Sequence, residues 1–262
     1  MILDSLTDIN FTVSNIISLV PSQTELLYHL GLEEKVCGIT KFCVHPSAWK
    51  KTKTIVGGTK QVNYDAIKKL SPDLIIANKE ENEKAQIEEL AKEYNIWVTN
   101  VVDLESALQM IKDIGVITGT GAAAEKLTQQ IETSSQDFHP LMKKLRTCYL
   151  IWQKPFMTVG GDTFIHDMLS KCGFENIYSH KTRYPILEIK ELADNNCELL
   201  ILSSEPYPFK PKHVFELQRQ LPGTKIILAD GEMFSWYGSR LLKAASYFEA
   251  LLASINDDLK HN

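Results

Sequence analysis

Short apolar runs alternate with amphipathic segments along most of the chain. The apolar runs are rich in β-branched residues and predict buried strands, whereas apolar residues spaced three and four positions apart predict helices. The predicted strands cover residues 15–20, 36–40, 73–77, 96–101, 148–152, 198–203 and 225–229. The predicted helices include residues 64–70, 104–118, 163–171, 189–195, 211–221 and 240–257. Such alternation is typical of α/β folds with parallel sheets.

Local signals mark some helix boundaries. Ser22 and Glu25 form the S-x-x-E pattern, in which two side chains satisfy free backbone N–H groups at a helix start. Gly119 and Gly121 begin a match to the dinucleotide-binding fingerprint G-x-G-x-x-A. The residues before them keep a helical period, and the next predicted strand is not followed by an acidic residue that could bind ribose. We therefore expect these glycines to join two helices.

The segment from Ala122 to Leu145 carries helix-forming residues at its start and no strand signal. At about 1.5 Å per residue, a helix of this length spans the diameter of a small domain. The pattern predicts two α/β lobes, residues 1–118 and 147–262, joined by one backbone helix over residues 119–146. Ligands of open α/β sheets lie beyond the carboxyl ends of the strands, so we expect the binding site in a cleft between the lobes.

Composition narrows the function classes. The chain has 262 residues, 44% of them hydrophobic and 23% charged, with a formal net charge of −5. An acidic, well-mixed composition argues against a nucleic-acid partner, and no apolar run is long enough for a membrane span. We expect a monomer. Residues Met1–Asn10 lack the basic start and apolar centre of a secretory signal, so the chain as written predicts a cytoplasmic protein.

Motifs for catalysis or direct metal ligation are weak. The five cysteines form no C-x-x-C pair, and Cys43 with His45 has no second pair that would complete a tetrahedral site. No G-x-S-x-G nucleophile motif is present. Residues 160–163, Gly-Gly-Asp-Thr, favour a tight turn with a helix cap, and an anion site on free helix amides is the alternative. We expect no enzymatic activity and no intrinsic cofactor.

Two kinds of side chain recur in the loops that follow predicted strands. Lysines at 41, 60 and 79 favour a cleft that attracts carboxylates or phosphates, although scattered lysines are commonly solvated surface. Aromatic residues in the same kind of loop are Phe42, Trp152, Phe156, Tyr184, Tyr207, Phe209, Phe234, Trp236 and Tyr237. Residues 232–238 are too apolar for a plain surface loop, so we expect them to pack on a ligand with a broad, flat face.

Several segments together resemble a known family. They are Ile17–Glu25, Gly57–Gly58 with Asn63, Leu70–Ala77, Gly160–Leu169, Cys172–Ile177 and Ser235–Arg240. They resemble the helical-backbone metal receptors, which are the class III substrate-binding proteins of ABC importers, and are most similar to the cobalamin-binding branch. The resemblance covers about Asn15 to Leu252. It implies two Rossmann-like lobes, a single backbone helix and a location that is normally periplasmic or membrane-anchored outside the cytoplasm.

The resemblance also implies site residues, because Phe42 and Tyr184 match aromatic positions at which the family holds its ligand. Together with residues of the strand-end loops, the expected ligand-binding set is Phe42, His45, Lys60, Lys79, Trp152, Tyr184, Trp236, Tyr237 and Arg240. Thr59 and Asn78 stand where the best-known cobalamin receptor carries tryptophan, and the adjacent lysines suit an anionic chelate such as a ferric siderophore. The family docks on its permease through one glutamate in each lobe, for which Glu83 matches, and Glu191 lies next to a lysine at the second position.

The leading hypothesis is a receptor for a metal chelate, a cobalt or iron complex and first of all a corrinoid such as cobalamin, that serves an ABC permease. Because the metal arrives already chelated, the protein need not supply metal ligands. The alternatives are a ferric siderophore or haem receptor, a cytoplasmic protein that processes or hands on a metal complex, and a sensor or scaffold that binds a partner protein.

Overall fold

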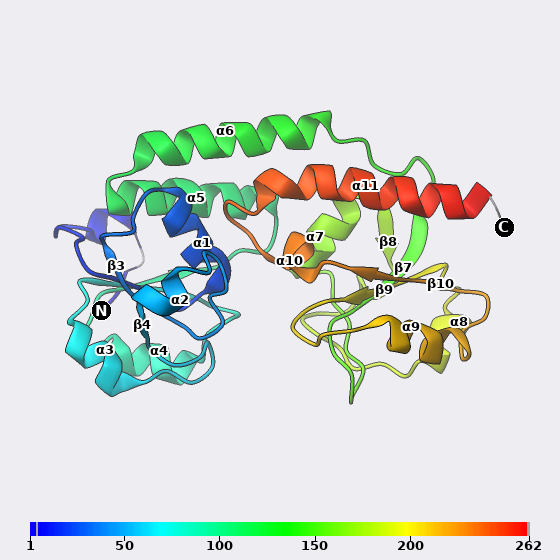
Figure 1. The fold of residues 1–262 in the computed structure, drawn as a ribbon, viewed down its shortest axis with the longest axis horizontal. Coiled ribbons are helices and arrows are strands. Elements are labelled where there is room, and N and C mark those ends of the chain that lie inside the picture. Colours follow the sequence, from blue (N-terminus) through cyan, green and yellow to red (C-terminus); the bar gives the residue numbers. More distant parts are fainter. Residues whose placement is uncertain (4, 261–262) are drawn as a thin grey trace. The chain divides into compact units, whose positions relative to one another are not determined.

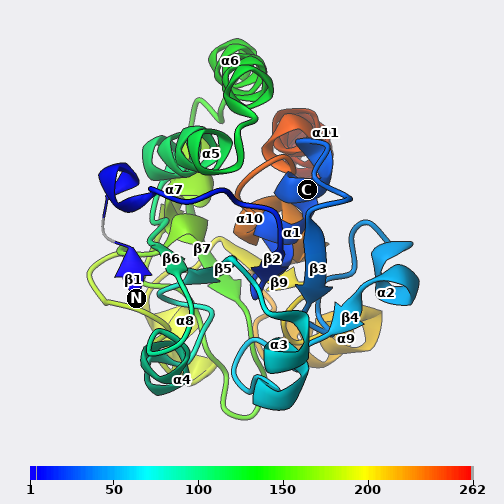
Figure 2. The ribbon, with the colours of Figure 1, turned by 90° about the vertical axis from the view of Figure 1, so that its left-hand side faces the viewer.

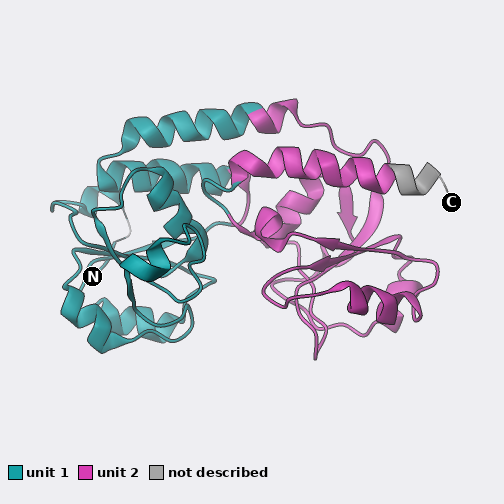
Figure 3. Ribbon diagram, in the orientation of Figure 1, with its two compact units in different colours: residues 1–101, 105–133, 237–240 teal, residues 102–104, 134–236, 241–262 magenta. Residues whose placement is uncertain are grey.

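The computed structural model describes residues 1–3 and 5–260 (Figure 1). The described chain forms two compact units, which are coloured separately in Figure 3. Unit 1 comprises Met1–Val101, Glu105–Thr133 and Tyr237–Arg240. Unit 2 comprises Val102–Leu104, Ser134–Trp236 and the residues from Leu241 onward. Both units are α/β lobes, as the alternating pattern predicts, and α6 (Gly121–Asp137) runs from unit 1 into unit 2.

Unit 1 is built on a six-stranded parallel sheet with the order β1-β6-β5-β2-β3-β4. The strands are β1 (Ile2–Leu3), β2 (Ile16–Ser18), β3 (Val36–Ile39), β4 (Thr54–Ile55), β5 (Leu74–Asn78) and β6 (Ile96–Thr99). The helices and the 3-10 turn are η1 (Leu6–Asp8), α1 (Pro21–His29), α2 (Trp49–Thr52), α3 (Tyr64–Leu70), α4 (Lys84–Leu90) and α5 (Leu104–Thr118). Figure 2 shows α3 and α4 against one face of the sheet and α5 on the other side. The α3–α4 face buries a cluster that includes Ile17, Ile67, Ile75 and Ile87.

Unit 2 has a four-stranded parallel sheet with the order β10-β9-β7-β8. The strands are β7 (Leu145–Leu150), β8 (Phe174–Asn176), β9 (Leu199–Ser203) and β10 (Lys225–Ala229). The helices are α7 (Phe164–Lys171), α8 (Lys190–Asp194), α9 (Pro211–Gln218), α10 (Gly231–Ser235) and α11 (Leu241–Lys260). Its core includes Cys148, Leu150, Leu200 and Leu202, all from the two central strands and all fully buried. Parallel strands covered on both faces are continuously apolar, which is why these segments lack a strict polar alternation.

The predicted joint between two helices is confirmed. Gly119 adopts a φ of 75° between α5 and α6, a conformation that favours glycine. A Cβ added to Gly115 would lie 2.4 Å from the Cβ of Ala124, so the two helices approach as closely as a glycine allows. The glycines that match the dinucleotide-binding fingerprint therefore serve the junction and close packing of α5 and α6.

The backbone helix predicted over residues 119–146 ends earlier in the structure. The helix α6 ends at Asp137, and the chain is irregular until β7 begins at Leu145. Pro140 explains the difference, because a proline disfavours the helical conformation of the residue before it and cannot donate the backbone hydrogen bond that a helix needs. Among the described residues, every helix falls short of the length and apolarity that crossing a bilayer requires.

Candidate functional site

In unit 1, the loop after β3 presents an aromatic ring to solvent. Phe42 is 51% exposed, although large apolar side chains are usually buried. The Lys41 Nζ lies 5.1 Å from the centroid of this ring, within the range of a cation–π contact. Gly58 lies next to the ring, since a Cβ added there would be 3.1 Å from the Phe42 Cε2 and 3.4 Å from the Lys41 Cε. The ring therefore packs next to Gly58 and Lys41 and keeps about half of its surface accessible.

Buried amides fix the loop after β5. Asn78 is 2% exposed, and its Oδ1 accepts hydrogen bonds from the backbone N–H groups of Glu80 (2.8 Å) and Glu81 (3.1 Å). The Asn82 Nδ2 donates to the carbonyl of Thr59 at 2.9 Å, which ties this loop to the one that follows β4. Because the Asn78 side chain is buried and hydrogen-bonded to the loop backbone, it offers no surface on which a ligand could stack.

The other site residues predicted in unit 1 lie around these loops. Lys60 and Lys79 are exposed, and the Lys60 Nζ donates to the carbonyl of Glu80 at 2.7 Å. His45 is half-buried and follows Phe42 in the same loop. The structure thus places Lys60 after β4 and Lys79 after β5, in two loops that the Asn82–Thr59 hydrogen bond joins, and it places Phe42 and His45 in the loop after β3. Whether they contact a ligand stays a prediction.

In unit 2, the loop after β7 presents Trp152, which is 40% exposed. Its ring packs edge-on against Tyr207 with centroids 5.7 Å apart, and the Tyr207 hydroxyl donates to the Gln153 Oε1 at 2.7 Å. Isolated bridges link Trp152 to Met157, and Met157 to Ile186, which is 66% exposed. Tyr184 is half-buried, two residues before Ile186. An apolar patch therefore lies at the carboxyl end of the central strand β7.

Three further predicted site residues are buried instead of exposed. Trp236 is 6% exposed, and its indole Nε1 donates to the Glu205 Oε1 at 2.8 Å. Burial raises the pKa of the Tyr237 hydroxyl well above its usual value, the charge of Glu81 adds to the rise, and the nearby polar side chains of Ser22 and Gln23 offset part of it. Arg240 is 6% exposed. Its guanidinium pairs with the Glu25 carboxylate through Nε–Oε2 (3.0 Å) and Nη2–Oε1 (2.8 Å).

These contacts explain why residues 232–238 are so apolar. Their aromatic rings fill the interiors of their own units, and Phe234 is fully buried against Tyr149. Sequence reasoning associated the apolar character of the segment with a ligand, whereas packing inside the protein accounts for it. In this structure, the side chains of Trp236, Tyr237 and Arg240 therefore present almost no surface to a ligand.

Glu205 is a half-buried carboxylate at the carboxyl end of β9 that sequence reasoning missed. Its Oε1 accepts from Ser235 Oγ (2.6 Å) as well as from Trp236. Burial raises the pKa of the Glu205 carboxyl, and the nearby charges of Glu232 and Asp230 add to the rise, while the two hydrogen bonds counteract it. A carboxylate that anchors a tryptophan in this way positions the loop that follows α10.

We expect Glu205→Gln to remove one source of pH dependence from the stability of unit 2. The folded pKa lies above the unfolded pKa, so the wild-type protein loses stability as the pH rises above about 4.5 and through the folded pKa. Glutamine still accepts both hydrogen bonds and carries no charge. Urea titrations of both proteins between pH 4 and 8, followed by Trp fluorescence, should show a gain for the variant only toward higher pH. A gain of equal size at every pH would contradict the prediction.

The two predicted docking acids differ in environment. Glu83 is exposed at the start of α4. Glu191 is half-buried in α8, where its carboxylate accepts from the Glu188 backbone N–H at 3.2 Å and from the Tyr178 hydroxyl at 3.5 Å. Lys190 pairs with Glu188 at 2.7 Å. Of the two, Glu83 has the side chain more open to a partner.

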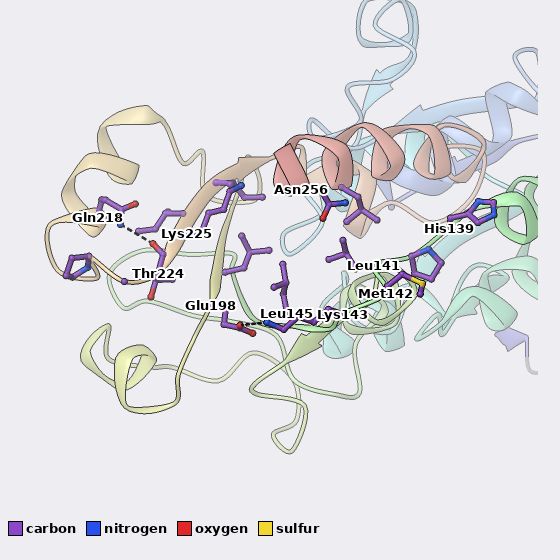
Figure 4. Close-up of a pocket in the computed structure, with 17 residues that line it drawn as sticks. His139, Leu141, Met142, Lys143, Leu145, Glu198, Gln218, Thr224, Lys225 and Asn256 are labelled. Atoms are coloured by element: carbon purple, nitrogen blue, oxygen red, sulfur yellow. Dashed lines mark hydrogen bonds and ion pairs between the residues drawn. The ribbon is translucent and has the colours of Figure 1, made fainter. Parts of the chain in front are cut away.

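Each unit has a pocket at one end of its own sheet. The larger cavity, about 1180 Å³, lies in unit 2 at the amino-terminal ends of β7, β9 and β10 (Figure 4). Its polar groups already pair with one another: Lys143 with Glu198 at 3.6 Å, and the Gln218 Nε2 with the carbonyl of Thr224 at 3.0 Å. A second pocket of about 510 Å³ lies in unit 1, next to Lys41 and Gly58. Only this smaller one is at the end of a sheet where α/β proteins bind ligands.

In the structure, residues 160–163 form the turn and helix cap that the sequence favoured over an anion site. The Thr163 hydroxyl accepts from the His166 backbone N–H at 3.2 Å and caps α7, as the turn interpretation predicts. A Cβ added to Gly161 would lie 2.1 Å from the carbonyl oxygen of Ser179, so the glycines permit close backbone packing. Within the described part of the chain, no three His, Cys, Asp or Glu side chains gather in a group that could hold a metal ion.

The fold and the strand-end loops are those of a binding protein with two α/β lobes. Residues 16–223 match the family model of the periplasmic binding proteins, and the chain belongs to this family. It is 30% identical over 197 residues to the uncharacterized ABC transporter substrate-binding lipoprotein YvrC of Bacillus subtilis (strain 168). That alignment covers 71% of this chain and 62% of the lipoprotein, so the chain spans less than two thirds of this relative.

Other relatives are covered almost completely. A vitamin B12-binding protein of Pectobacterium carotovorum is 25% identical over 254 residues, which is 92% of this chain and 89% of the relative. The structure of the periplasmic heme-binding protein BhuT in complex with two hemes superposes with a TM-score of 0.78 at 18% identity, covering 92% of this chain and 98% of the other. The second likeness concerns the fold.

The prediction of a cytoplasmic location is wrong. The family consists of periplasmic binding proteins, and the relatives include a substrate-binding lipoprotein of an ABC transporter. The prediction relied on the first residues of the chain, whereas the family match depends on residues 16–223.

Proposed function

We propose that this chain is the substrate-binding component of an ABC importer and that it binds a metal chelate, with a corrinoid as the first candidate. The observation that carries the proposal is the exposed ring of Phe42, supported by Gly58 at the carboxyl ends of parallel strands. An exposed aromatic ring in that position provides a stacking surface for a flat macrocycle. The vitamin B12-binding relatives support the same choice of ligand.

The apolar patch of unit 2 offers a second surface of the same kind. Trp152 and Ile186 are exposed there, half-buried Tyr207 packs against Trp152, and half-buried Tyr184 lies two residues before Ile186. A chelate whose metal is already coordinated needs apolar area and a few polar contacts instead of protein ligands. We therefore assign ligand contact to Phe42, Trp152 and Tyr184, with His45, Lys60 and Lys79 at the margin. Trp236, Tyr237 and Arg240 hold the loops that support this surface.

The experiment is a panel of purified ligands measured by calorimetry and absorption spectroscopy: aquocobalamin, dicyanocobinamide, haem and a ferric siderophore. We expect a corrinoid to bind, to raise the melting temperature by mass action and to be recovered chemically unchanged. Recovery of an altered corrinoid would contradict a pure binding role and would favour an enzyme. Absence of binding by any member of the panel would overturn the proposal.

A haem or ferric siderophore receptor is the second candidate. The observation that favours it is the set of exposed ammonium groups at the strand ends of unit 1, those of Lys41, Lys60 and Lys79, because such groups attract anionic ligands. The heme-binding structural neighbour is compatible with it. In the panel above, haem bound more tightly than either corrinoid would select this candidate.

We further propose that the protein acts as a monomer outside the cytoplasmic membrane and docks on its permease through Glu83. We expect Glu83→Ala to lower ligand uptake by a reconstituted importer several-fold while leaving the Kd for the free ligand unchanged, because the side chain is exposed at the start of α4. The matched control is Glu93→Ala, which changes an exposed acid just beyond the carboxyl end of α4. Equal uptake by the two variants would contradict a docking role for Glu83.

A further inference from the structure

The smaller pocket adjoins the surface that we assign to the ligand. We call it the side pocket; it has a volume of about 510 Å³ and is lined by Lys41, Gly57, Gly58, Gln61, Val62, Asn63, Tyr64 and Asp65. Gly58 is common to the pocket wall and to the support of the Phe42 ring, and Lys41 lines the pocket while its ammonium lies over the same ring. A group attached to a macrocycle stacked on Phe42 therefore enters the side pocket next to it.

The rim of the side pocket carries both signs of charge. Lys41 contributes an exposed ammonium group, and Asp65 contributes an exposed carboxylate from the first turn of α3. The Asn63 Oδ1 accepts from the Ala66 backbone N–H at 3.1 Å, so its NH₂ group is left as a donor. Gln61 adds an exposed amide, and Tyr64, which is 42% exposed, adds a hydroxyl. The lining thus offers donors and acceptors with no net charge.

This combination discriminates between the side arms that metal macrocycles carry. A carboxylate arm gains from Lys41 but is repelled by Asp65, and it can only accept hydrogen bonds. A primary amide arm can donate to the Asp65 carboxylate or accept from Lys41, so it meets neither group with repulsion. We infer that the side pocket receives an amide-bearing side arm of the chelate and selects amidated macrocycles against their carboxylate forms. The inference rests on the proposed function and narrows its ligand class.

The test uses two corrinoids that share one ring system. Dicyanocobinamide carries amide arms, and dicyanocobyrinic acid carries carboxylates in their place. We expect the wild-type protein to bind the amide form more tightly in calorimetric titrations at low ionic strength. Asp65→Asn removes the repulsion and should reduce the preference for the amide form by about fivefold to tenfold. Lys41→Gln removes the attraction and should increase that preference, because the carboxylate form then meets only Asp65.

The control is Glu88→Gln, which changes the net charge of unit 1 as Asp65→Asn does but on the exposed face of α4. A preference that shifts equally in Asp65→Asn and Glu88→Gln would overturn the side-pocket inference and leave the proposed function standing. Equal binding of the two corrinoids by the wild-type protein would also overturn it. Failure of both corrinoids to bind any of the proteins, all shown to be folded by thermal melting, would overturn the corrinoid proposal itself.

Discussion

Replacing Arg240 with methionine is expected to lower the free energy of unfolding of unit 1 by about 3 kcal/mol. The Arg240 side chain is 7% exposed and forms two contacts with the carboxylate of Glu25 on α1, whose side chain is 16% exposed. Removal of the guanidinium leaves a carboxylate that is largely withdrawn from water and has lost its opposite charge. Because Glu25 keeps some exposure to water, the expected loss of free energy lies at the lower end of the range measured when one partner of a buried ion pair is removed.

Urea denaturation monitored by circular dichroism measures this loss, and a double variant tests its cause. Arg240→Met combined with Glu25→Met removes both charges and should recover much of the stability, because no uncompensated charge remains. The exposed pair Lys84–Glu88 provides the control: Lys84→Met should change the free energy of unfolding by about 0.5 kcal/mol at most. A loss in Arg240→Met no larger than in the control would show that the pair contributes little.

The second large effect concerns the ligand. Phe42→Ala is expected to weaken corrinoid binding by about 1–3 kcal/mol, the range found when an aromatic stacking surface is truncated. The side chain is 51% exposed, so its removal should leave the fold and the melting temperature of the free protein nearly unchanged. Calorimetric titration with the corrinoid that the wild-type protein binds provides the measurement.

Two further variants make the Phe42 result specific. Phe42→Trp retains an aromatic face and should restore most of the affinity. Phe215 is 74% exposed on α9, at a distance along the chain from every residue assigned to the ligand, and Phe215→Ala should leave the Kd unchanged. If Phe42→Ala binds the corrinoid as tightly as Phe215→Ala does, the stacking surface lies elsewhere.

Periodicity predicted the α/β class and the longer strands because these properties are local. The strands β5 and β9 are buried throughout and apolar up to their last residues, Asn78 and Ser203, and the glycines between α5 and α6 do join two helices. The strands β1 and β4 span only two residues each, too few for a period to emerge, and their pairing depends on neighbours far along the chain.

The site was harder to predict because exposure is not local. Ser22 and Glu25 match a helix-capping pattern, yet α1 begins at Pro21 without a side-chain cap, and Glu25 is engaged by Arg240 far along the sequence. Trp236 and Trp152 both follow strands in the sequence, but one is buried against Glu205 and the other is exposed. A residue's position in a loop therefore predicted its neighbourhood, while tertiary packing decided whether its ring is accessible.

The short segment Tyr237–Arg240 has a consequence for how the chain matures. It belongs to unit 1, although nearly all the residues around it in the sequence belong to unit 2. During synthesis, all the residues between α1 and Tyr237 must leave the ribosome before Tyr237 reaches the side chains of Ser22 and Gln23 and before Arg240 reaches Glu25. Unit 1 begins to be translated first, but it cannot finish folding until Tyr237–Arg240 has been made. Until then, Glu25 lacks the positive charge of Arg240.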